Sequence, residues 1–162
     1  MMRLSLASLL IFGQHASSSC AAAGGCLSGK RLSNLADRFQ RRYWDKLALV
    51  KYPPPPRDAR TCAQLAQEMS SSLNSRAVSP WKYSINRDVD RIPHEIAFAE
   101  CICQGCIINQ HEDLKYNSVP VFAPLMVLKK TRCGNDPSKY EVKNDFINVP
   151  LACTCVVPKY VK

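Results

Sequence analysis

Cysteine is the residue type in this chain whose spacing could do chemistry, and five of the nine cysteines lie in two short patches. On a β-strand, Cys153 and Cys155 point to the same face about 6.6 Å apart, and so do Cys101 and Cys103. Gly105 then allows a turn that redirects Cys106. Two pairs of closely spaced thiols predict two parallel disulfides that tie two strands together. A zinc site is the alternative, but the C-x-C spacing without a C-x-x-C partner disfavours it.

The amino-terminal residues predict secretion, which bears on the state of these thiols. Residues 1–23 have the pattern of a signal peptide: Arg3, an apolar run over residues 4–12, then small residues, with cleavage expected between Ala16 and Ala23. Eight cysteines remain if the cut follows Ala23. Thiols that enter an oxidising compartment mostly pair. We therefore expect a secreted, extracellular protein rich in disulfides, without a metal ion or any other cofactor.

The remaining polar residues do not suggest an enzyme. His94 and His111 are the histidines outside the signal peptide, and neither belongs to a triad motif or a zinc-binding pair. The carboxylates of the predicted domain show no paired general acid and base, and cysteines held in disulfides cannot act as nucleophiles. We predict no catalytic residues.

The positive charge is concentrated near the amino terminus. The whole chain carries a net charge of +9, and residues 24–60 contain nine basic and three acidic residues. Such a segment could contact acidic glycans, a membrane surface or an acidic protein, or it could only be solvated. No nucleic-acid partner is expected for a secreted chain that has no nucleic-acid-binding motif.

Residues 24–74 are predicted to form a basic helical extension. Apolar residues recur every three or four positions between Leu32 and Val50, which predicts an amphipathic helix. Its apolar side is expected to dock on the protein's own domain or to fray in solution. The alternative is a membrane-active cationic helix, but Asp37 and Asp45 interrupt its positive charge, and no membrane insertion is expected. A proline-rich linker follows at residues 53–56. Thr61 and Gln64 have the spacing of a capping box and predict a second short helix.

Residues 75–162 are predicted to form a small all-β domain. The period of apolar residues changes to two after Pro80, and strands are expected at residues 81–85, 95–103, 119–130 and 140–157. Residues 87–93 are expected to form a charged loop, residues 107–117 a polar loop and residues 133–137 a turn.

The order of several motifs in this domain resembles the interleukin-17 cytokine family, most of all its C-type member and next its D-type member. The resemblance covers about residues 75–158 and is carried by Ser79–Tyr83, Asp90–Pro93, Ala97–Ile107, Asn117–Pro124, Val127–Lys130, Phe146–Pro150 and Cys153–Val156.

The resemblance implies a cystine-knot-like fold of two antiparallel β-hairpins. It pairs Cys101 with Cys153 and Cys106 with Cys155. Serines replace the third cystine of a full knot, and they fall on Ser79 and Ser118. Members of the family are dimers, often linked between chains by disulfides. Here such a link would join Cys133 to Cys26 or Cys62, and Cys103 has no assigned partner.

The implied function is that of a secreted homodimeric cytokine that brings receptor ectodomains together in inflammatory and mucosal defence. Aromatic side chains anchor many interfaces, so the candidate receptor contacts are two aromatic residues and the charged loop beside them: Trp81, Tyr83, Arg87, Asp88, Asp90 and Arg91. Trp81 could equally be a structural residue packed at the dimer seam. The alternatives are a secreted cystine-knot antagonist that sequesters another ligand, and a cationic antimicrobial whose helix acts on membranes.

Overall fold

A computed structural model of the chain describes residues 25–47, 60–68 and 72–159. The predicted signal peptide and the predicted linker lie outside the described residues. The elements in chain order are α1 (Gly29–Arg42), the 3₁₀ turn η1 (Trp44–Lys46), α2 (Cys62–Gln67), β1 (Trp81–Arg87), β2 (Arg91–Ile92), β3 (Glu95–Cys101), β4 (Cys106–Ile108), β5 (His111–Asp113), β6 (Asn117–Cys133) and β7 (Asp136–Val156). The all-β, cystine-knot-like fold class predicted from the sequence is confirmed.

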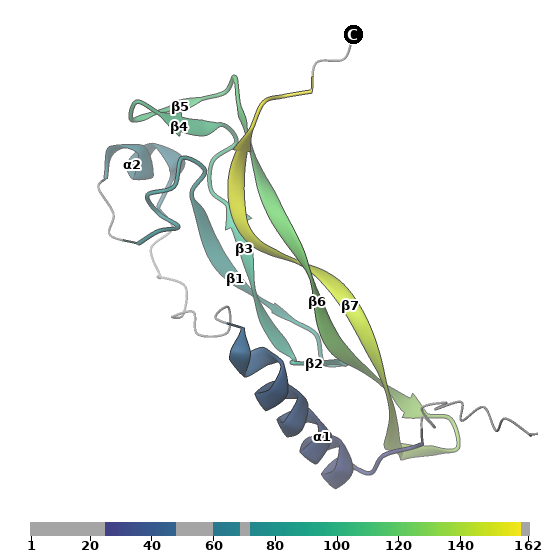
Figure 1. The fold of residues 1–162 in the computed structure, drawn as a ribbon. Helices are drawn as coiled ribbons and strands as arrows, with labels where there is room; N and C mark the ends of the chain where they lie inside the picture. The colour runs from purple at the N-terminus through teal and green to yellow at the C-terminus, as the bar shows by residue number, and fades with distance from the viewer. Residues whose placement is uncertain (1–24, 48–59, 69–71, 160–162) are drawn as a thin grey trace, which may run out of the picture.

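Strands β6 and β7 form a long twisted ribbon along the whole molecule (Figure 1). The ribbon tolerates Pro120 and Pro124, which have no backbone N–H, because no hydrogen bond to β7 needs a donor at these two positions. Both lie an even number of residues from Met126, whose backbone N–H points away from β7 and donates to the Tyr43 hydroxyl at 3.1 Å. The missing proline donors therefore fall on the outer edge of β6. In β7, Leu151 is skipped in the register, where Val121 faces Ala152 and Phe122 faces Pro150.

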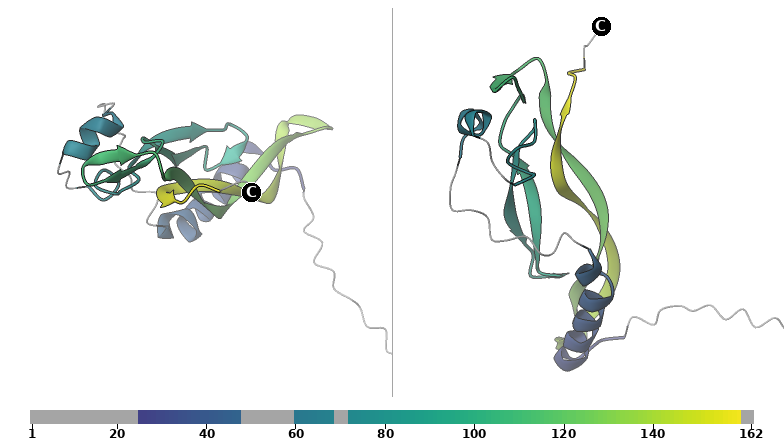
Figure 2. Two further views of the ribbon diagram at one scale, coloured as in Figure 1. Left: turned by 90° about the horizontal axis from the view of Figure 1, so that it is seen from above. Right: turned by 60° about the vertical axis from the view of Figure 1, so that its left-hand side comes forward.

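The second hairpin, β1 with β3, lies against this ribbon, and the two-residue strand β2 adds to the free edge of β6. Figures 1 and 2 show α2 and the small β4–β5 hairpin at one end of the ribbon, with α1 at the other end. The main core lies between the hairpins and α1 and contains five buried side chains: Trp44, Ile96, Leu125, Val127 and Val149. Phe39, Tyr43 and Leu47 pack against it, so the predicted apolar stripe docks on the protein's own domain.

Three sequence predictions need correction. The first helix ends at Arg42 instead of Val50, and η1 then turns Trp44 into the core. The strand predicted over residues 95–103 ends at Cys101, so Cys103 does not share a strand face with Cys101. Residues 106–113 form the β4–β5 hairpin instead of a loop, because Asn109 and Gln110 adopt positive φ angles of 48° and 65°. Two such residues make the tight turn that a two-residue hairpin needs.

Candidate interaction surface

Two disulfides clamp the hairpins together. Cys101 at the end of β3 is bonded to Cys153, and Cys106 in β4 is bonded to Cys155, with Cα atoms 5.7 and 6.0 Å apart. Cys153 and Cys155 belong to β7, so both bonds tie the β3–β4 region to the long ribbon. This is the pairing that the resemblance implies. It also uses the sulfurs that the zinc alternative would need as thiolates.

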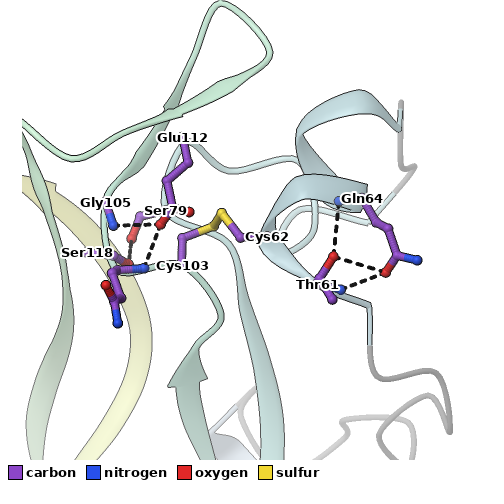
Figure 3. Close-up of a disulfide and its surroundings, with 9 residues drawn as sticks. Thr61, Cys62, Gln64, Ser79, Cys103, Gly105, Glu112 and Ser118 are labelled. Atoms are coloured by element: carbon purple, nitrogen blue, oxygen red, sulfur yellow. Dashed lines mark hydrogen bonds between the residues drawn. A yellow bond between two sulfur atoms is a disulfide. The ribbon is translucent and has the colours of Figure 1, made fainter.

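The third knot position holds two serines in contact. Ser79 precedes β1 and Ser118 lies in β6, and their hydroxyl oxygens are hydrogen-bonded to each other (Figure 3). Ser79 is only 1% exposed. A buried hydroxyl needs a partner, and each serine supplies one to the other. The resemblance assigned both residues to this position, and the structure brings them together.

A further disulfide attaches α2 to the connection between β3 and β4. Cys62 is bonded to Cys103, and Thr61 and Gln64 beside it form the predicted capping box, with Gln64 N–H donating to Thr61 Oγ1 at 3.3 Å (Figure 3). The carboxylate of Glu112 lies close to this bond. Both sulfurs are oxidised, so this group is a structural cluster without free thiolate ligands.

Glu112 also fixes the loop that follows Cys103. One of its carboxylate oxygens accepts the backbone N–H groups of Gln104 and Gly105, both at 2.8 Å. A side chain at Gly105 would collide with the backbone of Asp113, so this loop requires glycine. Nothing in the sequence separates Glu112 from other exposed carboxylates, and the sequence analysis missed this role.

The remaining disulfide uses one of the two pairs that the resemblance implies for a link between chains, and it forms here within one chain. Cys133 at the end of β6 is bonded to Cys26 of the same chain, with Cα atoms 6.1 Å apart. Next to it, Leu27 and Tyr140 exchange two backbone hydrogen bonds of 2.8 and 2.9 Å. All eight cysteines of the described residues are paired within the chain. The segment before α1 is thus fastened to the tip of the ribbon.

The charged turn between β1 and β2 is the most exposed part of the predicted contact surface. Arg87 and Glu95 form an exposed ion pair at 2.8 Å, Val89 is 73% exposed, and Asp90 is exposed. Asp88 caps the turn from within, because its Oδ1 accepts the N–H of Asp90 at 2.9 Å.

Arg91 is buried beneath this turn and stabilises it by hydrogen bonds. It is 4% exposed, and its guanidinium donates to the backbone carbonyls of Asn86, Pro93 and His94 at 3.1–3.3 Å. Burial lowers the pKa of Arg91, and the charge of Asp88 opposes that shift. Even so, a guanidinium stays protonated in proteins. Arg91 is better described as a positioning residue than as a contact.

The two aromatic candidates lie in the second hairpin. Trp81 is 8% exposed and packs against Ala99 and Cys153. Trp81 is therefore buried within its own chain. Tyr83 is half-buried, and its hydroxyl donates to the carbonyl of Leu151 at 3.2 Å. Little aromatic surface is left here for a partner.

Large apolar side chains are exposed instead on the ribbon. Phe122 and Phe146 are 55% and 65% exposed. Phe146 faces Met126 across the ribbon, and Phe122 lies four residues before Met126, so the two phenylalanines share one face. Leu125 and Val127 point to the opposite face, into the core.

Comparison with known proteins now identifies the family. A sequence model described as Interleukin-17 matches residues 77–157, half of the chain. The chain belongs to the interleukin-17 family. It is 36% identical to human interleukin-17C over 116 residues and 38% identical to human interleukin-17D over 86 residues. It is also 31% identical to human interleukin-25 over 118 residues, which are 68% of this chain and 67% of that protein.

The family predicted from the motifs is therefore confirmed, and it is a family of cytokines. The aligned residues make up 65% of this chain and 59% of human interleukin-17C, and 51% of this chain and 42% of interleukin-17D. The chain thus spans about half the length of these two interleukin-17 relatives. Among the described residues, no helix is long and apolar enough to cross a membrane.

Proposed function

We propose that this interleukin-17 family member is a secreted homodimeric cytokine that brings cell-surface receptor chains together. The observation that supports this most is the family match over the whole disulfide-clamped domain, residues 77–157. A rigid scaffold loses little conformational entropy when a partner binds it. A two-fold dimer presents the same surface twice, which suits the capture of two receptor chains.

The exposed face of the ribbon is our candidate for the dimer seam. Phe122 and Phe146 are exposed on one face of the ribbon, which they share with Pro124 and Met126, and exposed apolar patches of this kind are typical of interfaces. Because all eight described cysteines are paired within the chain, the proposed dimer is held by packing and not by a bond between chains.

The charged turn at residues 87–90 is our candidate receptor contact, with Arg91 as its support. The turn is exposed, and its shape is fixed by the hydrogen bonds of Arg91 and Asp88. Charged groups in such a turn give specificity and a fast association rate more than raw affinity. Trp81 and Tyr83 then stabilise the hairpin that carries the turn.

The test uses purified protein on reporter cells that express receptor chains of the interleukin-17 type. We expect wild-type protein to activate the reporter. The double variant Arg87→Glu with Asp90→Lys reverses the charge at two proposed contacts, and it is expected to reduce activation at least about tenfold. Lys143→Glu with Asp145→Lys is the matched control on β7. Protein that inhibits another cytokine without activating any receptor would support the antagonist instead.

The dimer is tested separately by sedimentation. Phe122→Ser with Phe146→Ser is expected to convert dimer to monomer, while Leu114→Ser, at an exposed apolar residue after β5, leaves the dimer intact. A wild-type monomer at micromolar concentration would contradict the proposal.

Two further parts of the proposal concern the amino-terminal region. We propose that residues 1–23 are removed during secretion, that residues 24–74 form the extension of the cytokine domain, and that this extension binds acidic glycans. The antimicrobial alternative needs a free apolar helix face. In α1 that face packs on the core through Phe39 and Tyr43, which favours the cytokine.

A further inference from the structure

The outward side of α1 carries a row of arginines that form no ion pair among the described residues. Arg31, Arg38 and Arg41 are exposed, and together with Leu27 and Asn34 they line a surface hollow of about 510 Å³. Arg31 and Arg41 are ten residues apart, which is about 15 Å along a helix axis. The described part of the chain forms six ion pairs, and none of them involves a basic residue of α1.

The hollow has a net positive charge. Asp37 is the single acidic residue in its lining, against three arginines. A guanidinium is planar and always charged, and it binds sulfate, phosphate or carboxylate oxygens with two parallel hydrogen bonds. Unpaired arginines in one row are therefore suited to an extended anion.

Both ends of α1 are fixed to the ribbon, so the row is held in place. At its start, the Cys26–Cys133 disulfide and the backbone pairing of Leu27 with Tyr140 hold the chain. After its end, the Trp44 indole N–H donates to the Met126 carbonyl at 3.1 Å, beside the bond from Met126 to Tyr43. A site built on such a rigid element binds with little ordering cost.

The same anchoring disfavours a membrane as the partner. A helix that lies in a bilayer interface buries an apolar side, and the apolar side of α1 is already packed against the core. No large apolar residue of α1 is exposed. What remains outward is a linear cationic surface in which Leu27 and Leu35 are only partly exposed.

We infer that this hollow is a binding site for a linear sulfated polysaccharide, held by Arg31, Arg38 and Arg41. The inference rests on the proposed secretion, because sulfated polysaccharides are extracellular polyanions. A linear polyanion matches a linear row of cations better than a folded acidic protein does. Binding there would retain the cytokine near the cells that release it.

The test measures binding to immobilised heparin in physiological salt and elution by a salt gradient. Arg31→Gln, Arg38→Gln and Arg41→Gln combined are expected to weaken heparin binding at least about tenfold, because each cation near an anionic surface contributes to affinity. The matched control is Lys82→Gln, Lys129→Gln and Lys143→Gln, which removes the same charge from ion-paired positions. Elution of the arginine variant together with this control would overturn the inference.

Three further readouts separate the possible partners and the proposed function. Binding to desulfated heparin is expected to be much weaker, and equal binding would contradict a sulfate site. Vesicles of phosphatidylcholine with phosphatidylserine are expected to bind weakly, and retention as strong as on heparin would favour a membrane instead. The arginine variant is expected to keep reporter activation on receptor-bearing cells that lack sulfated glycans. Wild-type protein that binds heparin through these arginines but does not activate the reporter would count against the receptor proposal alone.

Discussion

At the scale of single residues, Arg91 shows how a buried charge can shape an exposed turn. Its three bonds to backbone carbonyls replace the water that burial removes. We expect Arg91→Ala to lower the free energy of unfolding by about 2–4 kcal/mol, because it removes the guanidinium donor from three carbonyls, of which that of His94 keeps the N–H of Asp88. The measurement is urea denaturation with the disulfides intact. Arg87→Ala removes only an exposed ion pair and is expected to cost less than about 1 kcal/mol. Equal losses for the two variants would contradict the role of Arg91.

The serine pair gives a second prediction at this scale. Ser79 and Ser118 already touch through their hydroxyls, so Ser79→Cys with Ser118→Cys is expected to form the third bridge of a full cystine knot. A new crosslink stabilises by about 2–4 kcal/mol in general, and less here because two neighbouring disulfides already restrict the chain. Thiol alkylation followed by mass spectrometry counts the free cysteines, and the melting temperature reports stability. Two free thiols in the double variant would show that the side chains are not in contact.

Asp136 at the tip of the ribbon gives a prediction about pH. Hydrogen bonds from the side chain of Ser138, and then the contact with Lys139, lower the pKa of Asp136 from about 3.8 to about 2. A carboxyl whose pKa is lower in the folded state stabilises the protein above its unfolded pKa and loses that effect as the pH falls to 2. Asp136→Asn is therefore expected to lower the melting temperature at pH 6, and the difference from wild type is expected to shrink between pH 4 and pH 2. A difference that stays constant over this range would contradict the lowered pKa.

The sequence predicted residues best where their chemistry is local. Thr61 and Gln64 are three residues apart, and that spacing alone defines a capping box. Glu112 acts on Gln104 and Gly105 only after β4 and β5 have paired. The roles of Arg91 and Trp81 depend on burial, which an alternating pattern of residues does not reveal at a turn or at the start of a strand.

At the scale of elements, α1 and η1 act as a strap that covers the outer edge of β6. Trp44 is 2% exposed in the main core and donates to the Met126 carbonyl. We expect Trp44→Ala to lower the free energy of unfolding by about 3–5 kcal/mol, as is usual when a large aromatic side chain is removed from a core. Urea denaturation measures the loss, and faster proteolysis of residues 29–47 shows that the strap has opened. Lys46→Ala in the same turn is the exposed control. A loss as small as that of the control would mean that the strap does not contribute to the core.

The strap also shows why the spacing of apolar residues did not predict the end of the first helix. The apolar stripe continues in sequence past Tyr43, and no proline or glycine marks the stop. The helix nevertheless ends at Arg42, because Tyr43 and Trp44 bond to Met126, which lies more than eighty residues away in sequence. The β4–β5 hairpin was not predicted, because its strands of three residues are too short to show a period of apolar residues. The ribbon strands are 17 and 21 residues long, and their alternation was readable.

At the scale of the whole molecule, the four disulfides hold a thin domain together at separate places. Cys101–Cys153 and Cys106–Cys155 join the hairpins, Cys62–Cys103 attaches α2, and Cys26–Cys133 attaches α1 at the far tip of the ribbon (Figure 1). Small secreted domains depend on such crosslinks because their cores are limited. The family resemblance indicated the two bonds of the knot. The other two join segments outside the matched block to it.

The central claim is a rigid platform closed by four disulfides within each chain and dimerised by packing. Peptide mapping of the secreted, non-reduced protein, with separation of monomer and dimer on a non-reducing gel, tests it directly. The account predicts the pairs Cys26–Cys133, Cys62–Cys103, Cys101–Cys153 and Cys106–Cys155, and a chain that runs as a monomer in detergent. A covalent dimer joined through Cys26 or Cys133, or free thiols at Cys101 and Cys153, would contradict it.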